Sequence, residues 1–185
     1  MLKLNTSIKD RDLLQMSVMK ALYRDVQVRI YGNNDGKLRI DECLSTRLCS
    51  KLEEYGKLRD GYIDPYEAGF LVYKGVAEFN GKTGEEAFEK IIGFIDDFLM
   101  FQVYLDLRKR GKRVSRGPRR RSLLLIEGSH VYEVHVMSEG EIITPRELAE
   151  LSKYSLANAR TPIAAIVDST GIITYYSMAK SDIIK

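Results

Sequence analysis

Two helix-start signals of the same design, one in each half of the chain, constrain the fold most strongly. Residues 64–67 (DPYE) and 144–147 (TPRE) each combine an N-cap residue, a proline at the first helical position and a glutamate that can reach back to the cap. Short runs rich in β-branched and apolar residues lie before and after both signals. This alternation predicts an α/β (α+β) protein built from two small mixed layers.

The remaining periodicity and turn chemistry place the other elements. We expect helices at 13–23, 41–52, 64–74, 83–110 and 144–159, strands at 26–30, 38–40, 76–79, 131–137, 163–167 and 172–176, and a further ordered apolar run at 123–126. The stretch 83–110 has 28 residues and is longer than a typical globular helix, so a break is expected near 93–97. We place the domain boundary there, which gives an N-terminal domain of residues 1–92 and a C-terminal domain of residues 93–185.

Three details of the interior follow from the same patterns. In the strand 131–137 (VYEVHVM), Tyr132, Val134 and Val136 share one face, which predicts a half-buried strand. In the helix that Thr144 opens, the leucines at 148, 151 and 156 suggest a buried stripe. Cys43 and Cys49 have neither a metal-ligand spacing nor the pattern of a disulfide framework, so we expect two small buried apolar residues.

Length and composition set the class of protein. The chain has 185 residues, of which 44% are hydrophobic, and none of its apolar runs approaches the roughly 20 residues that cross a bilayer. Its first residues, MLKLNTSIKDRD, lack the apolar stretch and cleavage site of a secretory signal. We therefore expect a soluble, cytoplasmic protein with no membrane contact.

Positive charge is concentrated in one segment, which we call the basic tract. Nine of the fourteen residues at 108–121 (RKRGKRVSRGPRRR) are lysine or arginine and none is acidic, although the net charge of the whole chain is only +3. Local positive charge between ordered elements favours a folded nucleic-acid-binding surface. Two alternatives stay open: a solvated basic loop without a partner, and arginines that brace the fold through carboxylates such as Asp106.

The sequence offers little support for the common catalytic chemistries. It contains no phosphate-binding glycine motif and no nucleophile elbow, and we expect neither a metal nor a cofactor. His130 and His135 lie five apart, so a shared strand would aim them at opposite faces, and each is expected to be a structural residue. A metal-free ribonuclease remains open, because RNA carries its own 2′-hydroxyl nucleophile and the protein need supply only a base, an acid and a cation. His130, Tyr132 and nearby arginines are of the right types.

Three segments carry a resemblance to a known family. Residues 61–79 (GYIDPYEAGFLVYKGVAEF), 103–114 (VYLDLRKRGKRV) and 163–176 (IAAIVDSTGIITYY) resemble, in this order, the archaeal tRNA splicing endonucleases. The family has a helix followed by a Lys-Gly turn, a helix that ends in Arg-Lys-Arg-Gly, and a closing Val-Asp, turn, Ile-x-Tyr-Tyr hairpin. The resemblance implies a nuclease-like C-terminal domain with a mixed sheet and a closing hairpin. It also implies metal-free removal of introns from precursor tRNA at bulge-helix-bulge motifs.

The family's catalytic tyrosine, histidine and lysine are all replaced in this chain. Their positions fall on Glu127, Ser129 and Arg160, and His130 lies one residue late on a strand, where a shift by one reverses the side chain's direction. The resemblance therefore implies a structural, non-catalytic subunit that assembles with a catalytic paralogue into an α2β2 heterotetramer. Two other hypotheses remain: an active subunit that uses His130, and a stand-alone RNA-binding module.

Two sets of residues complete the expected functional surface. The RNA-binding set, taken from the basic tract, is Arg108, Arg110, Lys112, Arg113, Arg116, Arg119, Arg120 and Arg121. The subunit interface implied by the resemblance is the edge of the closing hairpin with its loop, comprising Asp168, Ile172, Ile173, Tyr175 and Tyr176.

Overall fold

The computed structural model describes residues 26–33 and 35–178, and the chain divides into two compact units between Asp96 and Asp97. We call them unit 1 (Met1–Asp96) and unit 2 (Asp97–Lys185). The boundary expected from the sequence lies after residue 92. The helix expected at 13–23 lies outside the described residues.

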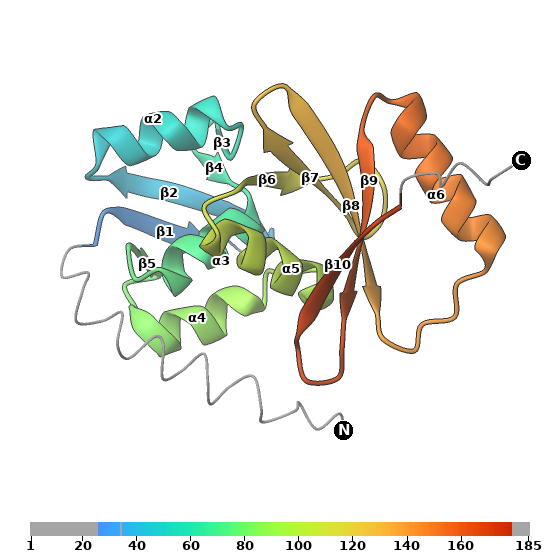
Figure 1. Ribbon diagram of the computed structural model, residues 1–185. Coiled ribbons are helices and arrows are strands. Elements are labelled where there is room, and N and C mark those ends of the chain that lie inside the picture. The colour runs from blue at the N-terminus through green and yellow to red at the C-terminus, as the bar shows by residue number, and fades with distance from the viewer. Residues whose placement is uncertain (1–25, 34, 179–185) are drawn as a thin grey trace, which may run out of the picture. The chain divides into compact units, whose positions relative to one another are not determined.

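Unit 1 contains a mixed five-stranded sheet with the strand order β3-β4-β2-β1-β5. Strand β1 pairs antiparallel with β2 and parallel with β5. The strands are β1 (Val28–Gly32), β2 (Leu38–Cys43), β3 (Leu58–Arg59), β4 (Tyr62–Ile63) and β5 (Ala77–Phe79), and the helices are α2 (Thr46–Glu54), α3 (Pro65–Tyr73) and α4 (Gly84–Ile92) (Figure 1). The strand expected at 38–40 is confirmed and is three residues longer. Residues 41–43, which were expected to begin a helix, therefore belong to β2, and α2 begins only at Thr46, after the cap Ser45.

The helix that Asp64 opens forms the centre of unit 1. The Asp64 carboxylate accepts hydrogen bonds from the backbone N–H groups of Tyr66 and Glu67, which confirms the predicted N-cap. The next eight residues, 66–73, are all buried, as is typical of a helix that is apolar on every side. Gly75, at φ 72°, follows the C-cap Lys74 and ends the helix where the sequence predicts it to end.

The long helical stretch is broken as predicted, into α4 and α5 (Phe98–Lys109). Thr83 is the N-cap residue of α4, yet among the described residues its side chain makes no capping hydrogen bond, and Gly84 follows it at φ 63°. Asp97 caps α5 instead, by accepting from the N–H of Met100.

Cys43 and Cys49 differ from the expected pair of buried apolar residues. Cys43 ends β2 and Cys49 lies on α2; both are half-buried and form a disulfide, with Cα atoms 6.5 Å apart. Ser45 caps α2 between them, so the strand turns directly into the helix and brings the two side chains together. The spacing in the sequence does not show such a turn.

Unit 2 also contains a mixed five-stranded sheet, in the order β10-β9-β8-β7-β6. Strands β8 and β9 run parallel and the other neighbours run antiparallel, so the expected mixed sheet and closing hairpin are present. The strands are β6 (Arg113–Arg116), β7 (Ser122–Glu127), β8 (His130–Ser138), β9 (Thr161–Val167) and β10 (Ile173–Ser177), and α6 (Pro145–Ala157) connects β8 to β9 (Figure 1). Both units are mixed α and β, as the sequence predicts.

Helices α5 and α6 contact opposite faces of this sheet. Ser155 of α6 forms a hydrogen bond with His135 of β8, and Tyr175 of β10 donates a hydrogen bond to Asp106 of α5. Across β9, Tyr175 is in register with Val136, the neighbour of His135. Because neighbouring residues of a strand point to opposite faces, the two helices contact opposite faces of the sheet. Strand β8 is consequently buried on both faces from 133 to 137, and the prediction that it is half-buried is wrong.

Helix α6 keeps the predicted capping box at Thr144 but not the predicted buried stripe. Leu148 and Leu156 are 37% and 51% exposed, and Ser155 is the buried residue of the helix. Of the helices in the described part of the chain, none has the length and apolar character needed to cross a membrane.

Candidate nucleic-acid interface

The basic tract runs along one edge of the unit 2 sheet. It begins in the last turn of α5, continues through the edge strand β6 and the loop 117–121, and ends where β7 begins. Because Arg113 pairs with Ile126 and Arg116 with Leu123, the tract extends from one end of β7 toward the other. Its charges are thus spread along an edge instead of being gathered in one pocket.

At least three of the predicted RNA-binding residues in the described part of the chain form ion pairs within unit 2. The Nε of Arg110 lies 3.0 Å from Oδ2 of Asp106, and this carboxylate raises the pKa of Arg110. Lys112 pairs with Glu127. These contacts match the alternative in which tract residues brace the fold.

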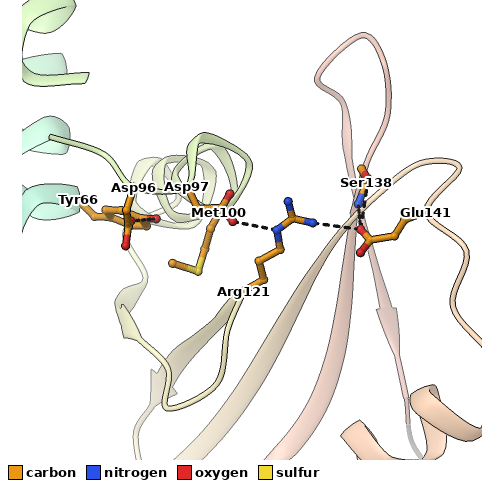
Figure 2. Close-up of polar contacts among 7 residues, drawn as sticks. All are labelled: Tyr66, Asp96, Asp97, Met100, Arg121, Ser138 and Glu141. Carbon is orange, nitrogen blue, oxygen red and sulfur yellow. Dashed lines mark hydrogen bonds and ion pairs between the residues drawn. The ribbon is translucent and has the colours of Figure 1, made fainter. Parts of the chain in front are cut away.

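Arg121 is the third such residue and joins two segments of unit 2. Its Nε lies 2.8 Å from Oδ2 of Asp97, and its Nη1 lies 3.3 Å from Oε2 of Glu141 (Figure 2). Glu141 in turn accepts from the backbone N–H of Ser138. The hydrogen bond that Arg121 donates to Asp97 raises the pKa of Arg121. Figure 2 also shows a separate contact in unit 1, where the buried Tyr66 donates to Asp96 across 2.9 Å.

The loop between β6 and β7 holds its backbone in a fixed conformation. The N–H of Gly117 donates to the carbonyl of Ser122 across 2.7 Å, and a Cβ added at Gly117 would lie 2.2 Å from Ser122 Oγ. The same hydroxyl accepts from the N–H of Arg119 and donates to its carbonyl. The loop is therefore built around Ser122, and only glycine fits at position 117.

This loop presents exposed arginines. Arg119 and Arg120 are exposed at its tip, and Arg116 is exposed at the end of β6. The Arg119 guanidinium carbon lies 4.5 Å above the centre of the Tyr154 ring, a distance typical of a cation–π contact. Of the remaining predicted residues, Arg108 donates to the carbonyl of Lys112 and Arg113 is half-buried in β6.

The positions that match the family's catalytic residues all lie at one end of the sheet. Glu127 ends β7 and is the cross-strand partner of His130, which begins β8, and Ser129 lies in the turn between them. Arg160 directly precedes β9, whose first residue pairs with Tyr132. Topology therefore brings the four positions together, as the resemblance implies.

The side chains at these positions are engaged in different ways. Glu127 pairs with Lys112, and Arg160 lies 3.3 Å from Oε2 of Glu133. Ser129 and His130 are exposed. A carboxylate and a guanidinium thus stand at the positions where the resemblance would put a phenol and an ammonium.

A buried polar network under α6 was not foreseen from the sequence. Glu133, His135 and Ser155 are at most 3% exposed. The Ser155 hydroxyl donates to Glu133 Oε2 across 3.0 Å and lies 2.9 Å from His135 Nε2. Within the described residues, Glu133 Oε1 has no hydrogen-bond partner.

The order of these groups indicates a structural role. In nucleophilic catalysis the histidine lies between the serine and the carboxylate, whereas here Ser155 lies between His135 and Glu133. Burial lowers the pKa of His135; the charge of Glu133 raises it in part and that of Arg119 lowers it further. His135 is therefore neutral at pH 7, which fits the structural role expected from the sequence. The helix-start signal at Thr144 was the clue that a covering helix would follow this strand.

The closing hairpin presents the edge of the sheet opposite β6. Strand β10 is an edge strand, and Ile172 and Tyr176 are 61% and 53% exposed. Tyr175 is half-buried and donates to Asp106 Oδ2 across 2.7 Å, and burial followed by the Asp106 contact raises its pKa. Ile173 is half-buried.

Asp168 is used within its own loop. Its carboxylate accepts from Thr170 Oγ1 and from the N–H groups of Thr170 and Ile172, and the bond from the Thr170 hydroxyl is the largest cause of its lowered pKa. Of the interface set, the residues with the most exposed side chains are therefore Ile172 and Tyr176.

The described residues contain no group of three or more His, Cys, Asp and Glu side chains placed to hold a metal ion.

No protein-family model matches the chain, and no curated protein matches it. Among solved structures it is similar to Hjc, a Holliday junction resolvase from the archaeal hyperthermophile Archaeoglobus fulgidus. The match has 11% identity and a TM-score of 0.38, and it covers 44% of this chain and 75% of that one. So distant a likeness says nothing about the substrate of this chain.

Proposed function

We propose that this chain is the non-catalytic subunit of a tRNA splicing endonuclease. In this role it binds precursor tRNA and holds a catalytic paralogue in an α2β2 heterotetramer. The proposal combines the sequence resemblance with the state of the side chains at the end of β7, β8 and β9.

The observation that carries the proposal is the pair of internal contacts made by Glu127 and Arg160. Cleavage of RNA through its 2′-hydroxyl needs a free base, an acid and a cation that can meet the developing charge on the phosphate. Glu127 is paired with Lys112, and Arg160 with the buried Glu133. A chain in which both of these side chains are used in internal ion pairs fits a structural subunit better than a nuclease.

Contact with RNA is supported by the exposed part of the basic tract. Arg119 and Arg120 are exposed on a loop whose backbone is hydrogen-bonded around Ser122, so the backbone itself loses little conformational entropy when these arginines meet phosphates. Arg110 and Arg121, by contrast, contribute mainly through their ion pairs within the fold.

Contact with a partner subunit is supported by the edge strand β10. An edge strand offers unpaired backbone groups to a second chain, and apolar side chains beside it add to the buried area. Ile172 and Tyr176 supply that exposed apolar surface.

The test is reconstitution with a triad-bearing paralogue. The purified chain, the paralogue and their mixture are incubated with a precursor tRNA that contains a bulge-helix-bulge motif, and the assemblies are weighed by native mass spectrometry. We expect a 2:2 complex that excises the intron and no excision by this chain alone. Excision by the lone chain, or activity of the paralogue that is indifferent to this chain, would contradict the proposal.

Two other functions remain as alternatives, each with one supporting observation. His130 is exposed and stands across from Glu127, which leaves it accessible for an active subunit. The exposed Arg119 and Arg120 would equally serve a stand-alone RNA-binding module. In that case RNA affinity would be the same with and without the paralogue.

A further inference from the structure

A row of alternating tyrosine and arginine crosses the unit 1 sheet. Tyr31 of β1 pairs with Arg39 of β2, Arg39 pairs with Tyr62 of β4, and Tyr62 pairs with Arg59 of β3. Residues directly opposite each other on antiparallel strands point to the same face. The four side chains therefore stand side by side on one face, and we call them the tyrosine–arginine row.

This face of the sheet is open. Tyr31 and Tyr62 are 40% and 42% exposed, and Arg39 and Arg59 are exposed. The neighbouring strand residues that point the other way, Ile30, Leu38 and Ile63, are at most 4% exposed and form the core. The row is thus the solvent side of a sheet whose other side is fully packed.

The guanidinium groups of the row are available for a ligand. Among the described residues, neither Arg39 nor Arg59 forms an ion pair, whereas the nearby Arg29 is paired with both Glu42 and Glu78. Arg39 lies against Gly61, where an added Cβ would be 3.6 Å from its Nε.

A third cation adjoins the row, and two acids limit its charge. The Nζ of Lys37 lies 5.6 Å from the centre of the Tyr62 ring. Asp41 lies in the β-bulge of β2, and Asp60 lies in the turn between β3 and β4; both are exposed. The surface is therefore weakly positive and strongly aromatic.

That combination selects one class of ligand. An acidic peptide would be held chiefly by charge, which is modest here, whereas an unpaired nucleotide offers a flat base for an aromatic ring and a phosphate for a guanidinium. The two tyrosines lie two strand spacings apart, roughly 10 Å, which leaves room for an arginine between two stacked bases. We propose that the tyrosine–arginine row binds unpaired nucleotides of a single-stranded RNA.

The inference concerns unit 1 and does not depend on the function proposed for unit 2. It is tested in the full chain carrying Arg119→Ala and Arg120→Ala, so that the loop of unit 2 does not mask the row. A fluorescein-labelled 12-nucleotide oligouridine is titrated by fluorescence anisotropy. The variants are Tyr31→Leu with Tyr62→Leu, which remove stacking, and Tyr31→Phe with Tyr62→Phe, which retain it. Leu44→Ala, an exposed apolar change outside the row, is the control.

We expect binding about tenfold weaker or more in the leucine pair, and within about twofold of the parent in the phenylalanine pair and the control. A 12-base-pair RNA duplex, whose bases are already stacked, should show no difference among these variants. The melting temperature of each variant reports whether it is folded. If the leucine pair does not fold, two other pairs are compared, Tyr31→Phe with Tyr62→Phe and Arg39→Gln with Arg59→Gln. We then expect the phenylalanine pair to retain binding and the glutamine pair to bind about tenfold more weakly.

Three results would overturn the inference. They are the absence of measurable oligouridine binding in the parent, equal affinity of the folded leucine pair and the parent, and displacement of oligouridine by polyglutamate at equal charge concentration. None of them bears on intron excision by the complex with the paralogue, so a failure here is distinguishable from a failure of the proposed function.

Discussion

Arg160 donates from Nη1 to Oε2 of Glu133 across 3.3 Å, and Glu133 is fully buried. Arg160 stands where the resemblance would put a catalytic lysine, at the start of β9. Its guanidinium is the positive partner of a carboxylate that has no other positive partner among the described residues. The position therefore contributes to the stability of the fold of unit 2.

Replacing Arg160 by methionine should lower the free energy of unfolding by about 3 kcal/mol, because it leaves the buried carboxylate of Glu133 without its counter-charge. Urea denaturation measures the loss. Arg146→Met is the matched control, since Arg146 forms only a surface pair with Glu150 and should change stability by less than about 1 kcal/mol. Adding Glu133→Gln to Arg160→Met should recover part of the loss. Equal losses in the free energy of unfolding for Arg160→Met and Arg146→Met would show that the Arg160–Glu133 pair does not stabilise the fold.

The acid stability of unit 2 should depend on Asp97. Burial raises the pKa of this carboxyl, but hydrogen bonds from the Met100 N–H and from Arg121 outweigh it, and the net pKa is lowered. A lowered pKa in the folded state means that the stabilisation is present above the unfolded value of about 3.9 and is lost as the pH falls through the folded value. Asp97→Asn should therefore be less stable than the parent at pH 7, and this difference should shrink below about pH 4. Thermal unfolding of both proteins between pH 2 and pH 7 checks it, and a difference independent of pH would contradict the ion-pair account.

His135 should titrate below the ordinary histidine range. Burial lowers its pKa, so the unfolded state binds a proton more readily, and His135 contributes stability above about pH 6.5 that is lost as the pH falls through the folded pKa. The imidazole proton resonances in an NMR titration measure this directly. The chain has only two histidines, so the spectrum of His130→Gln assigns the signals. A pKa for His135 at or above the ordinary value would show that the network with Ser155 is open to water.

The members of the basic tract should separate into two classes. Arg119→Ala and Arg120→Ala should weaken RNA binding and each reduce the slope of log affinity against log salt by about 0.7 to 0.9, with little change in stability. Arg121→Ala should instead lower the melting temperature, because it removes the contacts to Asp97 and Glu141. Anisotropy titrations at several salt concentrations and thermal unfolding of the same variants distinguish the classes. Uniform effects on binding by all three would mean that the whole tract faces the RNA.

Local chemistry in the sequence was enough to predict the helix starts at Asp64 and Thr144 and most strands, but not the start of α2, which was expected at residue 41 and lies at Thr46. Asp64 and Thr144 cap their helices because an N-cap depends on a few adjacent residues, and the break before Asp97 follows from helix length. The closing hairpin was predictable for the same reason, since its two apolar runs flank a single turn.

Features that depend on distant contacts were missed. The leucines of α6 follow a helical period, yet this helix packs through Ser155 onto a polar pair from β8. The Cys43–Cys49 disulfide depends on how β2 turns into α2, which spacing does not specify. The order of strands in the sheet also decides that Glu127, His130 and Arg160 share one end, and the residue types alone do not show that Arg160 is held by Glu133.

The central claim is that this chain supplies no proton-transfer group to RNA cleavage, and His130→Ala tests it most directly. Single-turnover excision of a precursor tRNA intron is measured for the complex of the catalytic paralogue with the parent chain and with the His130→Ala chain. We predict equal rate constants, and loss of excision when the catalytic histidine of the paralogue is replaced. A drop of about a hundredfold or more on His130→Ala, the size expected for loss of a general acid or base, would contradict the account and establish this chain as an active subunit.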